Sequence, residues 1–261
     1  YKFETIYYIA PQLWAWNEKR INEIKKYINS LYVILPFEKE FFESKHNYPV
    51  KFLGHPLADS IYNFKTNYNS SNKFITADKK PIIAILPGSR KQEIKKILNT
   101  VIETVKYFKE YQFIVAGAPN IDLSYYTSII KNKKIKVIEN KTYELLSVSY
   151  AAIVTSGTAT LETALFKVPQ VVCYKSSYFS FIIAKLIVNI KYISLVNLIM
   201  DQEIVKELIQ QDCNKNKITK ELKKILDLNH RKSLKVKYDE LASILGNFGT
   251  SKRVALDIIT K

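Results

Sequence analysis

Two short segments that contain glycine have residues suited to binding an anion, and the first of them is LPGSR at 86–90. This segment joins an apolar pentapeptide to a helical pattern. Gly88 lets the backbone approach a ligand closely, while Ser89 and the first amides of the helix can donate hydrogen bonds to it. Arg90 adds a permanent, forked cation that matches phosphate oxygens. The segment predicts a phosphate site, and its alternative is an ordinary tight turn followed by a surface arginine.

The second segment is TSGTATLE at 155–162, which also lies between an apolar stretch and a helical pattern. Ser156, Gly157 and Thr158 present amides and hydroxyls at the start of the helix. Glu162 lies about one turn further on, where a carboxylate can accept two hydrogen bonds from vicinal hydroxyls such as those of a ribose. A capping box is the alternative, but neither possible cap is followed three residues later by Glu or Gln. Together the two segments predict a cradle for a diphosphate and its nucleoside, on a pattern that is neither GxGxxG nor a P-loop.

No metal site and no cofactor are expected. The chain contains no Asp-x-Asp motif, which many sugar-nucleotide enzymes use to hold a divalent metal. Its three histidines and two cysteines lack metal-ligand spacing, and Cys173 and Cys213 are expected to be free thiols in a reducing compartment. Stabilisation of a leaving diphosphate is therefore assigned to Arg90 and the helix dipoles.

Alternating strand and helix patterns position these segments. Strands are predicted at 82–86, 112–117, 135–139, 151–155 and 170–174, and helices at 94–108, 123–131, 142–148 and 158–166. Because the strands are uniformly apolar, they predict a doubly wound, Rossmann-like α/β fold with a parallel sheet covered on both faces. Ligands bind such sheets at the carboxyl ends of the strands, where both segments lie. The strand at 170–174 is predicted to be the last one, and the remainder helical at 201–211, 217–226, 231–245 and 251–260.

The first part of the chain also alternates between strand and helix patterns. Strands are predicted at 1–11, 31–36 and 50–54, with a helix at 21–31 between the first two. The polar stretch 63–80 is the predicted domain boundary. An apolar helix is predicted at 178–190, and it has two interpretations: a helix buried in the protein or a helix that contacts lipid. It is too short and too charged to span a membrane, and the N-terminus does not have the pattern of a signal peptide.

The composition is that of a globular protein, but the charge is strongly basic. Hydrophobic residues make up 47% and charged residues 25%, which excludes the disordered and fibrous classes. The net charge is +16, and only four of the 40 basic residues are Arg. Since the lysines are spread along the chain without a run of five, compositional drift is favoured over a polyanion-binding or membrane-facing surface. No nucleic-acid partner is expected.

Longer stretches, in order along the chain, resemble one known family. They are YIAPQLWAWNEKR (8–20), LPFEKEFF (35–42), FLGHPLAD (52–59), LPGSRKQEI (86–94), SGTATLE (156–162), FSFIIAKLIV (179–188), YISLVNL (192–198) and VKELIQQDC (205–213). The chain resembles the lipid-A-disaccharide synthases, bacterial glycosyltransferases with the GT-B fold. APQLWAW, and SLVNL followed by ELIQ, are specific to that family, whereas LPGSR and SGTATLE alone are moderately specific.

The resemblance implies a division into domains. Residues 1–58 would be the end of an incomplete, acceptor-side Rossmann-like domain, 59–240 the UDP-sugar-binding Rossmann-like domain, and 241–261 a helix that packs back toward the first. Relative to the family, the sequence lacks roughly the first hundred residues, most of a domain. The general base is expected in that segment. Whether the segment is missing from the gene or only from this sequence stays open.

The resemblance also implies roles for single residues. Gly88, Ser89, Arg90, Ser156, Gly157, Thr158 and Ala159 would surround the diphosphate, Glu162 the ribose, and Asn197 the sugar-nucleotide. Weaker candidates are Trp16, His55, Lys175, Glu207 and Gln210. Trp16 could instead pack at a helix start, His55 could make a hydrogen bond at a hinge, and Lys175 could be a solvated side chain. Two positions depart from the family pattern. Val196 replaces an expected Pro, and Asp201-Gln202 replaces Gly-Arg, which removes a cation.

The implied reaction transfers 2,3-diacylglucosamine from UDP-2,3-diacylglucosamine to 2,3-diacylglucosamine 1-phosphate with inversion. Its products are UDP and the β-1′,6-linked disaccharide phosphate of lipid A (lipopolysaccharide) biosynthesis in a Gram-negative bacterium. The enzyme would act in the cytoplasm, peripherally on the inner face of the inner membrane, whose anionic surface suits the basic charge. Two alternatives stay open. One is another GT-B enzyme, such as a UDP-N-acetylglucosamine transferase or epimerase, and the other is a non-catalytic protein that binds nucleic acid.

Overall fold

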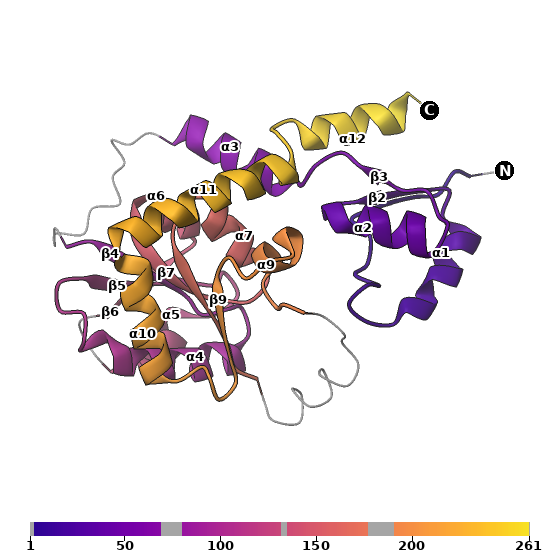
Figure 1. Ribbon diagram of the computed structural model, residues 1–261. Helices are drawn as coiled ribbons and strands as arrows, with labels where there is room; N and C mark the ends of the chain where they lie inside the picture. The colour runs from indigo at the N-terminus through magenta and orange to yellow at the C-terminus, as the bar shows by residue number, and fades with distance from the viewer. Residues whose placement is uncertain (1–2, 69–79, 132–134, 177–190, 261) are drawn as a thin grey trace. The chain divides into compact units, whose positions relative to one another are not determined.

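The computed structural model describes residues 3–68, 80–131, 135–176 and 191–260, and within them the chain forms two compact units (Figure 1). The first unit comprises the described parts of Tyr1–Thr66, Phe179–Lys191 and Glu240–Lys261. The second comprises the described parts of Asn67–Tyr178 and Tyr192–Asp239. All but the last residue of helix α3 (Leu57–Asn67) belong to the first unit, so its end lies several residues beyond the expected boundary at 58–59.

The second unit contains a six-stranded parallel sheet in the order β6-β5-β4-β7-β8-β9. Its strands are β4 (Ile82–Leu86), β5 (Gln112–Gly117), β6 (Ile135–Glu139), β7 (Ser149–Thr155), β8 (Gln170–Tyr174) and β9 (Lys206–Ile209). The chain runs outward from β4 to β6 and then returns to β7, on the other side of β4. The strand order therefore reverses between β4 and β7, the point where open α/β sheets bind ligands. The prediction of a doubly wound parallel fold is confirmed.

Helices cover both faces of this sheet. Ile83 and Ile85 of β4 pack in one buried cluster with α4 (Lys91–Val105), α5 (Leu123–Ile129), α10 (Lys215–Leu226) and Leu234 of α11 (Leu228–Leu245). Ala84 belongs to the cluster on the other face, with α6 (Thr142–Val148) and residues of α7 (Thr158–Leu165). Successive strand residues face opposite sides, so a strand covered on both sides must be apolar throughout.

The sequence prediction is wrong at the far edge of the sheet. Instead of a helix over 201–211, the structure has a short helix α9 (Leu195–Met200) and then strand β9. β9 pairs in parallel with β8, with Cys173 opposite Leu208. Val205 and Leu208 are buried, so the apolar residues that suggested one face of a helix instead fill the sheet edge.

The first unit has a small parallel sheet in the order β1-β2-β3. Its elements are β1 (Ile6–Tyr8), α1 (Ile21–Tyr27), β2 (Ser30–Val33), α2 (Pro36–Glu40) and β3 (Lys51–Phe52). The three strands and α1 are shorter than, or offset from, their predicted ranges. Glu38 is buried, and its carboxylate accepts hydrogen bonds from the Leu35 amide at 2.9 Å and the Trp14 indole at 3.0 Å. That carboxylate closes the amino end of α2, where amides lack helical partners.

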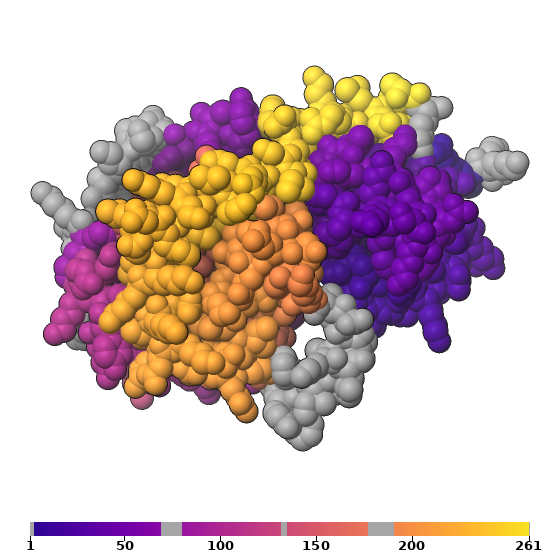
Figure 2. Space-filling view, viewed as in Figure 1, coloured from indigo at the N-terminus to yellow at the C-terminus, as the bar shows by residue number. Residues whose placement is uncertain are grey.

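The C-terminal residues complete the first unit. Asp59 on α3 accepts hydrogen bonds from the backbone amides of Gly249, Thr250 and Ser251 at 2.6–3.1 Å, at the start of α12 (Thr250–Ile259). Asp257 on α12 accepts hydrogen bonds from Tyr32 and Lys51. Figure 2 shows the yellow C-terminal helix against the indigo-to-purple N-terminal residues of this unit. The first unit is therefore built from both ends of the described chain.

Two membrane-related predictions have different outcomes. Among the described residues, no helix is both long enough and apolar enough to cross a bilayer. The predicted apolar helix at 178–190 lies outside the described residues, as does most of the polar stretch 63–80.

Candidate functional site

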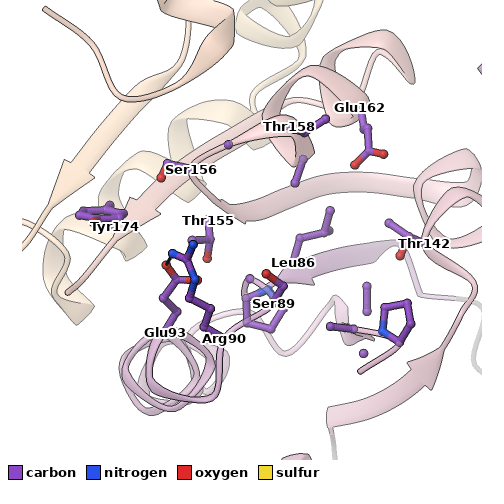
Figure 3. A pocket seen from close by; sticks show the side chains of 18 residues that line it. Leu86, Ser89, Arg90, Glu93, Thr142, Thr155, Ser156, Thr158, Glu162 and Tyr174 are labelled. Carbon is purple, nitrogen blue, oxygen red and sulfur yellow. Dashed lines mark hydrogen bonds and ion pairs between the residues drawn. The ribbon is translucent and has the colours of Figure 1, made fainter. Parts of the chain in front are cut away.

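A cavity of about 530 Å³ lies at the carboxyl ends of the central strands, where the strand order reverses (Figure 3). It is formed within the second unit by the loops that follow β4, β5 and β7, together with residues of α4, α6, α7 and β8. Its lining residues are Leu86, Pro87, Gly88, Ser89, Arg90, Glu93, Ala116, Gly117, Ala118, Pro119, Thr142, Thr155, Ser156, Gly157, Thr158, Ala159, Glu162 and Tyr174. The structure thus brings together the eight site residues predicted within the two segments: Gly88, Ser89, Arg90, Ser156, Gly157, Thr158, Ala159 and Glu162.

The first loop turns the chain from β4 into α4. Gly88 has a φ of +99°, and a Cβ there would lie 2.9 Å from Glu93 Oε2, so this position requires glycine. Ser89 is exposed at the end of the turn, and Arg90 directly precedes the first residue of α4. The Arg90 guanidinium is 82% exposed and lies 3.4 Å from the Glu93 carboxylate. It is therefore only loosely paired and is able to turn toward an anion in the cavity.

The second loop turns the chain from β7 into α7. Gly157, the cap of α7, has a φ of +114°, and no heavy atom lies within 4 Å of where its Cβ would be. Its carbonyl accepts hydrogen bonds from the Thr160 amide and hydroxyl. The glycine therefore provides the left-handed backbone and leaves open space on the cavity side. With α4, α7 directs a second helix amino end and its partial positive charge at the cavity, as an anion site requires.

Glu162 supplies a carboxylate to the cavity from the second turn of α7. Its Oε1 accepts a hydrogen bond of 3.0 Å from the hydroxyl of Tyr143, on α6. Burial raises the pKa of Glu162 above its usual value, and the hydrogen bond from Tyr143 partly offsets that shift. Burial and the adjacent carboxylate raise the pKa of Tyr143, so this hydroxyl remains a donor. The carboxylate points into the cavity in Figure 3.

Sequence reasoning missed several residues of the site. Thr142, Thr155 and Tyr174 line the cavity, and the Thr155 hydroxyl is buried without a hydrogen-bond partner among the described residues. Thr155 and Tyr174 end predicted strands, so the rule that ligands bind at carboxyl ends could have identified them. Tyr143 is not among the lining residues, and its contact with Glu162 joins residues 19 positions apart. No local pattern in the sequence indicates such a contact.

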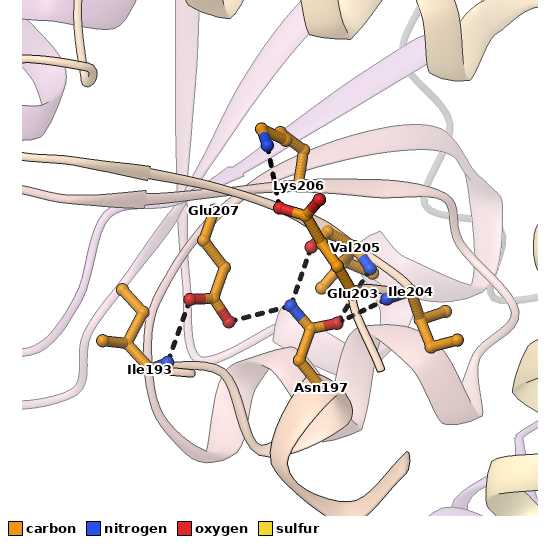
Figure 4. A network of polar contacts seen from close by, with 7 residues as sticks. All are labelled: Ile193, Asn197, Glu203, Ile204, Val205, Lys206 and Glu207. Atoms are coloured by element: carbon orange, nitrogen blue, oxygen red, sulfur yellow. Dashed lines mark hydrogen bonds and ion pairs between the residues drawn. The ribbon is translucent and has the colours of Figure 1, made fainter. Parts of the chain in front are cut away.

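Asn197 does not line the cavity. It is fully buried at the start of α9, where its side-chain amide donates to the Val205 carbonyl at 2.8 Å and to the Glu207 carboxylate at 2.9 Å (Figure 4). Its side-chain oxygen accepts hydrogen bonds from the Ile204 and Val205 amides. These contacts hold the connection between α9 and β9.

Glu207 and Gln210 also hold backbone rather than line the cavity. The Glu207 carboxylate accepts hydrogen bonds from the Ile193 and Ser194 amides, each at 2.9 Å. Gln210 accepts a hydrogen bond from the Ser176 amide and donates one to the Ser176 hydroxyl. Both residues therefore fasten the segments that flank 177–190.

None of the three other weak candidates lines the cavity, and two of them, Lys175 and His55, make hydrogen bonds to the backbone. The Lys175 ammonium donates to the Cys213 carbonyl at 3.2 Å. In the first unit, Trp16 is 55% exposed. His55 is buried, its Nδ1 accepts a hydrogen bond from the Leu57 amide, and burial lowers its pKa to about 4. The His55 contact fits the alternative of a hinge hydrogen bond, whereas Lys175 is partly buried and hydrogen-bonded rather than solvated.

The described residues contain no cluster of three or more His, Cys, Asp or Glu side chains that could hold a metal ion. Both cysteines are buried as free thiols, Cys173 on β8 and Cys213 after β9.

Comparison with known proteins identifies close similarity to one family. The family model described as "Lipid-A-disaccharide synthetase" matches residues 1–256. The lipid-A-disaccharide synthase of Coxiella burnetii (strain Dugway 5J108-111) is 35% identical over 257 residues, which cover 97% of this chain and 68% of that protein. The lipid-A-disaccharide synthase of Persephonella marina is 34% identical over 266 residues, covering 97% of this chain and 70% of that protein.

Solved structures share the fold at much lower sequence identity. The S. aureus MnaA–UDP co-structure superposes with a TM-score of 0.63 at 15% identity, over 92% of this chain and 64% of that one. The calicheamicin glycosyltransferase CalG4 gives a TM-score of 0.57 at 11% identity, over 93% of this chain and 59% of that one. Together with the parallel sheets, these neighbours confirm the predicted GT-B type of fold. The chain spans less than two thirds of the length of either structure.

Proposed function

Because the chain belongs to the lipid-A-disaccharide synthetase family of glycosyltransferases, we propose that its second unit binds the UDP portion of a UDP-linked sugar. The observation that supports this most directly is the cavity at the β4–β7 reversal. Two helix amino ends, the loop residues Ser89 and Ser156 and the exposed Arg90 cation meet there, about one helical turn from the Glu162 carboxylate. A nucleoside diphosphate needs these groups: donors and positive charge for its phosphates, and an acceptor for its ribose hydroxyls.

The proposed reaction transfers 2,3-diacylglucosamine from UDP to the 6-hydroxyl of 2,3-diacylglucosamine 1-phosphate. The new bond forms on the face of the anomeric carbon opposite the departing UDP, which inverts that centre. Negative charge grows on the diphosphate as the glycosidic bond breaks. Arg90, Ser89 and the amides of Ser156–Thr158 would stabilise this charge, and one preorganised donor of this kind typically contributes about 3 kcal/mol. The general base that accepts the hydroxyl proton is not assigned to any residue of the cavity.

The acylated sugars suggest where the protein acts. Both proposed substrates carry acyl chains and therefore partition to a membrane surface. The net charge of +16 favours the anionic cytoplasmic leaflet, where each lysine near the surface contributes about 1 kcal/mol. We propose peripheral association with the inner face of the inner membrane, for which binding to vesicles with and without anionic lipid is the direct test.

The nucleotide proposal is tested by thermal unfolding in UDP and in ADP. UDP at 100 times its dissociation constant should raise the free energy of unfolding by about 2.7 kcal/mol, and ADP by less. Glu162→Ala should lose the UDP effect. Glu103→Ala, which removes an exposed carboxylate from α4 outside the cavity, should keep it. A folded protein whose unfolding temperature does not respond to UDP would contradict the proposal.

A further inference from the structure

The hydroxyl of Tyr143 holds one oxygen of the cavity carboxylate. Tyr143 is the second residue of α6, and Glu162 is the fifth residue of α7. Their oxygens are 3.0 Å apart, and the Tyr143 ring packs against the Phe166 ring with centroids 5.3 Å apart. The ring is thus held by packing while its hydroxyl reaches Glu162. Tyr143 itself is not among the residues that line the cavity.

The hydrogen bond leaves the rest of the carboxylate available to a ligand. Tyr143 uses one lone pair of Oε1, and no described residue donates to Oε2. Two vicinal hydroxyls bind a carboxylate best when each donates to a different oxygen, which fixes the plane of the carboxylate. A partner on one oxygen, itself fixed by ring packing, restricts rotation of the carboxylate before the ligand arrives. Such preorganisation lowers the entropic cost of binding.

We propose that Tyr143 is a positioning residue for nucleotide recognition: it orients the Glu162 carboxylate so that it accepts hydrogen bonds from the ribose hydroxyls. This inference rests on the proposed function. It adds a residue of α6, the helix that follows β6, and this residue lies outside both sequence segments that suggested the site.

The charge state of Glu162 gives a second consequence. The cavity is also lined by Arg90 and Glu93, and Glu144 follows Tyr143 on α6. Burial favours the protonated form of Glu162, and the hydrogen bond from Tyr143 favours the ionised form. Without the Tyr143 hydroxyl, the pKa of Glu162 should rise further. Ribose recognition needs the ionised Glu162 carboxylate. When the pH is lowered, a variant without the Tyr143 hydroxyl should therefore lose this recognition at a higher pH than the wild type does.

The test compares the dissociation constants of UDP and 2′,3′-dideoxy-UDP by calorimetry. Both nucleotides have the same base and diphosphate, so their ratio isolates the ribose hydroxyls and cancels titration of the phosphates. The wild-type protein should prefer UDP about 100-fold, because hydrogen bonds to a charged acceptor are strong. Tyr143→Phe should reduce the preference to about tenfold, and Glu162→Gln should reduce it to near unity. Between pH 8 and pH 5, the preference should be lost at a higher pH in Tyr143→Phe than in the wild type.

Two controls separate positioning from structural damage. Tyr48→Phe in the first unit removes a hydroxyl that donates to the Ile28 carbonyl at 2.7 Å, and it should leave the preference for UDP unchanged. In the Glu162→Gln background, Tyr143→Phe should have little further effect on the preference, because the two residues act as a unit. Thermal unfolding without ligand checks that each variant is folded.

The failures are distinguishable. A wild-type protein that binds neither nucleotide would overturn the proposed function and this inference together. A protein that binds UDP and 2′,3′-dideoxy-UDP equally well would overturn the role of the Glu162–Tyr143 pair alone. Retention of the full preference in Tyr143→Phe, or tighter UDP binding in that variant, would overturn the positioning role while leaving the nucleotide site intact.

Discussion

Arg90 illustrates how a residue can matter for binding without mattering for stability. Its guanidinium is 82% exposed and lies 3.4 Å from Glu93, and exposed pairs of this kind contribute little to folding. Arg90→Ala should therefore leave the unfolding temperature unchanged and weaken UDP binding about tenfold, since a charge-assisted contact with phosphate is lost. Calorimetric titration with UDP measures the second effect, and the exposed Arg20 provides a control as Arg20→Ala. Loss of stability without loss of UDP affinity would contradict this view of Arg90.

Thr155 also lines the cavity, but its hydroxyl is buried and has no hydrogen-bond partner among the described residues. Replacing an unsatisfied buried hydroxyl with a methyl group of the same shape is nearly neutral or stabilising. Thr155→Val should leave the free energy of unfolding unchanged or raise it by up to about 1 kcal/mol. Urea unfolding measures the change, and Thr160→Val is the comparison. That variant removes a hydroxyl that donates to the Gly157 carbonyl at 2.8 Å and should destabilise the protein. A clear loss of stability in Thr155→Val would show that its hydroxyl has a partner.

At the scale of elements, the strands that surround the site were predictable and the edge strand was not. β4, β5, β6 and β8 occur at the predicted residues because short, mainly apolar stretches between helical patterns have few other stable placements. β9 was predicted as helix because Ile204, Val205 and Leu208 have helical spacing. Pairing with β8 and the hydrogen bond from the Val205 amide to the Asn197 side chain decide its conformation. β8 is far from β9 in the sequence, and neither contact is visible in the local spacing of apolar residues.

The network around Asn197 is expected to stabilise the second unit rather than contact the nucleotide. Asn197 is fully buried and makes two donor and two acceptor contacts. Asn197→Ala should lower the free energy of unfolding by about 2–4 kcal/mol, because the amides of 204 and 205 and the Glu207 carboxylate lose buried partners. UDP affinity measured well below the unfolding temperature should not change. Asn214→Ala, which removes the cap contact with the Lys217 amide and an exposed contact with the Gln211 carbonyl, should cost only about 1 kcal/mol. A folded Asn197→Ala protein with greatly weakened UDP binding would instead support the sugar-nucleotide role that the sequence suggested.

At the scale of the whole molecule, local patterns predicted the two binding loops but not the contacts that join distant elements. LPGSR and SGTATLE could be identified because glycine, hydroxyl and charged residues occur together where strands end. Tyr143 becomes relevant only when α6 and α7 pack side by side on one face of the sheet. Likewise, the contact of Asp59 with the start of α12 joins residues about 190 positions apart. Sequence periodicity gives no information on such pairs, since each depends on the assembled fold.

The first unit should become less stable at mildly acidic pH because of His55. Its imidazole is buried, and burial lowers its pKa from 6.5 to about 4 in the folded protein. Below pH 6.5 the unfolded chain binds a proton at this residue, whereas the folded protein does so only near pH 4. The stabilisation is therefore complete above about pH 6.5 and is lost as the pH falls toward 4, by up to roughly 3 kcal/mol.

Replacing His55 with a residue that does not titrate should remove this pH dependence. In His55→Asn, the side-chain oxygen can take over the hydrogen bond from the Leu57 amide that Nδ1 accepts at 3.1 Å. Urea unfolding at intervals between pH 7.5 and 4.5 should then show a smaller loss of stability in the variant than in the wild type. His230→Asn changes a partly exposed histidine of α11 and should alter the profile less, because a partly exposed imidazole is less desolvated. An unchanged profile in His55→Asn would mean that the folded protein accepts a proton at His55 as readily as the unfolded chain does.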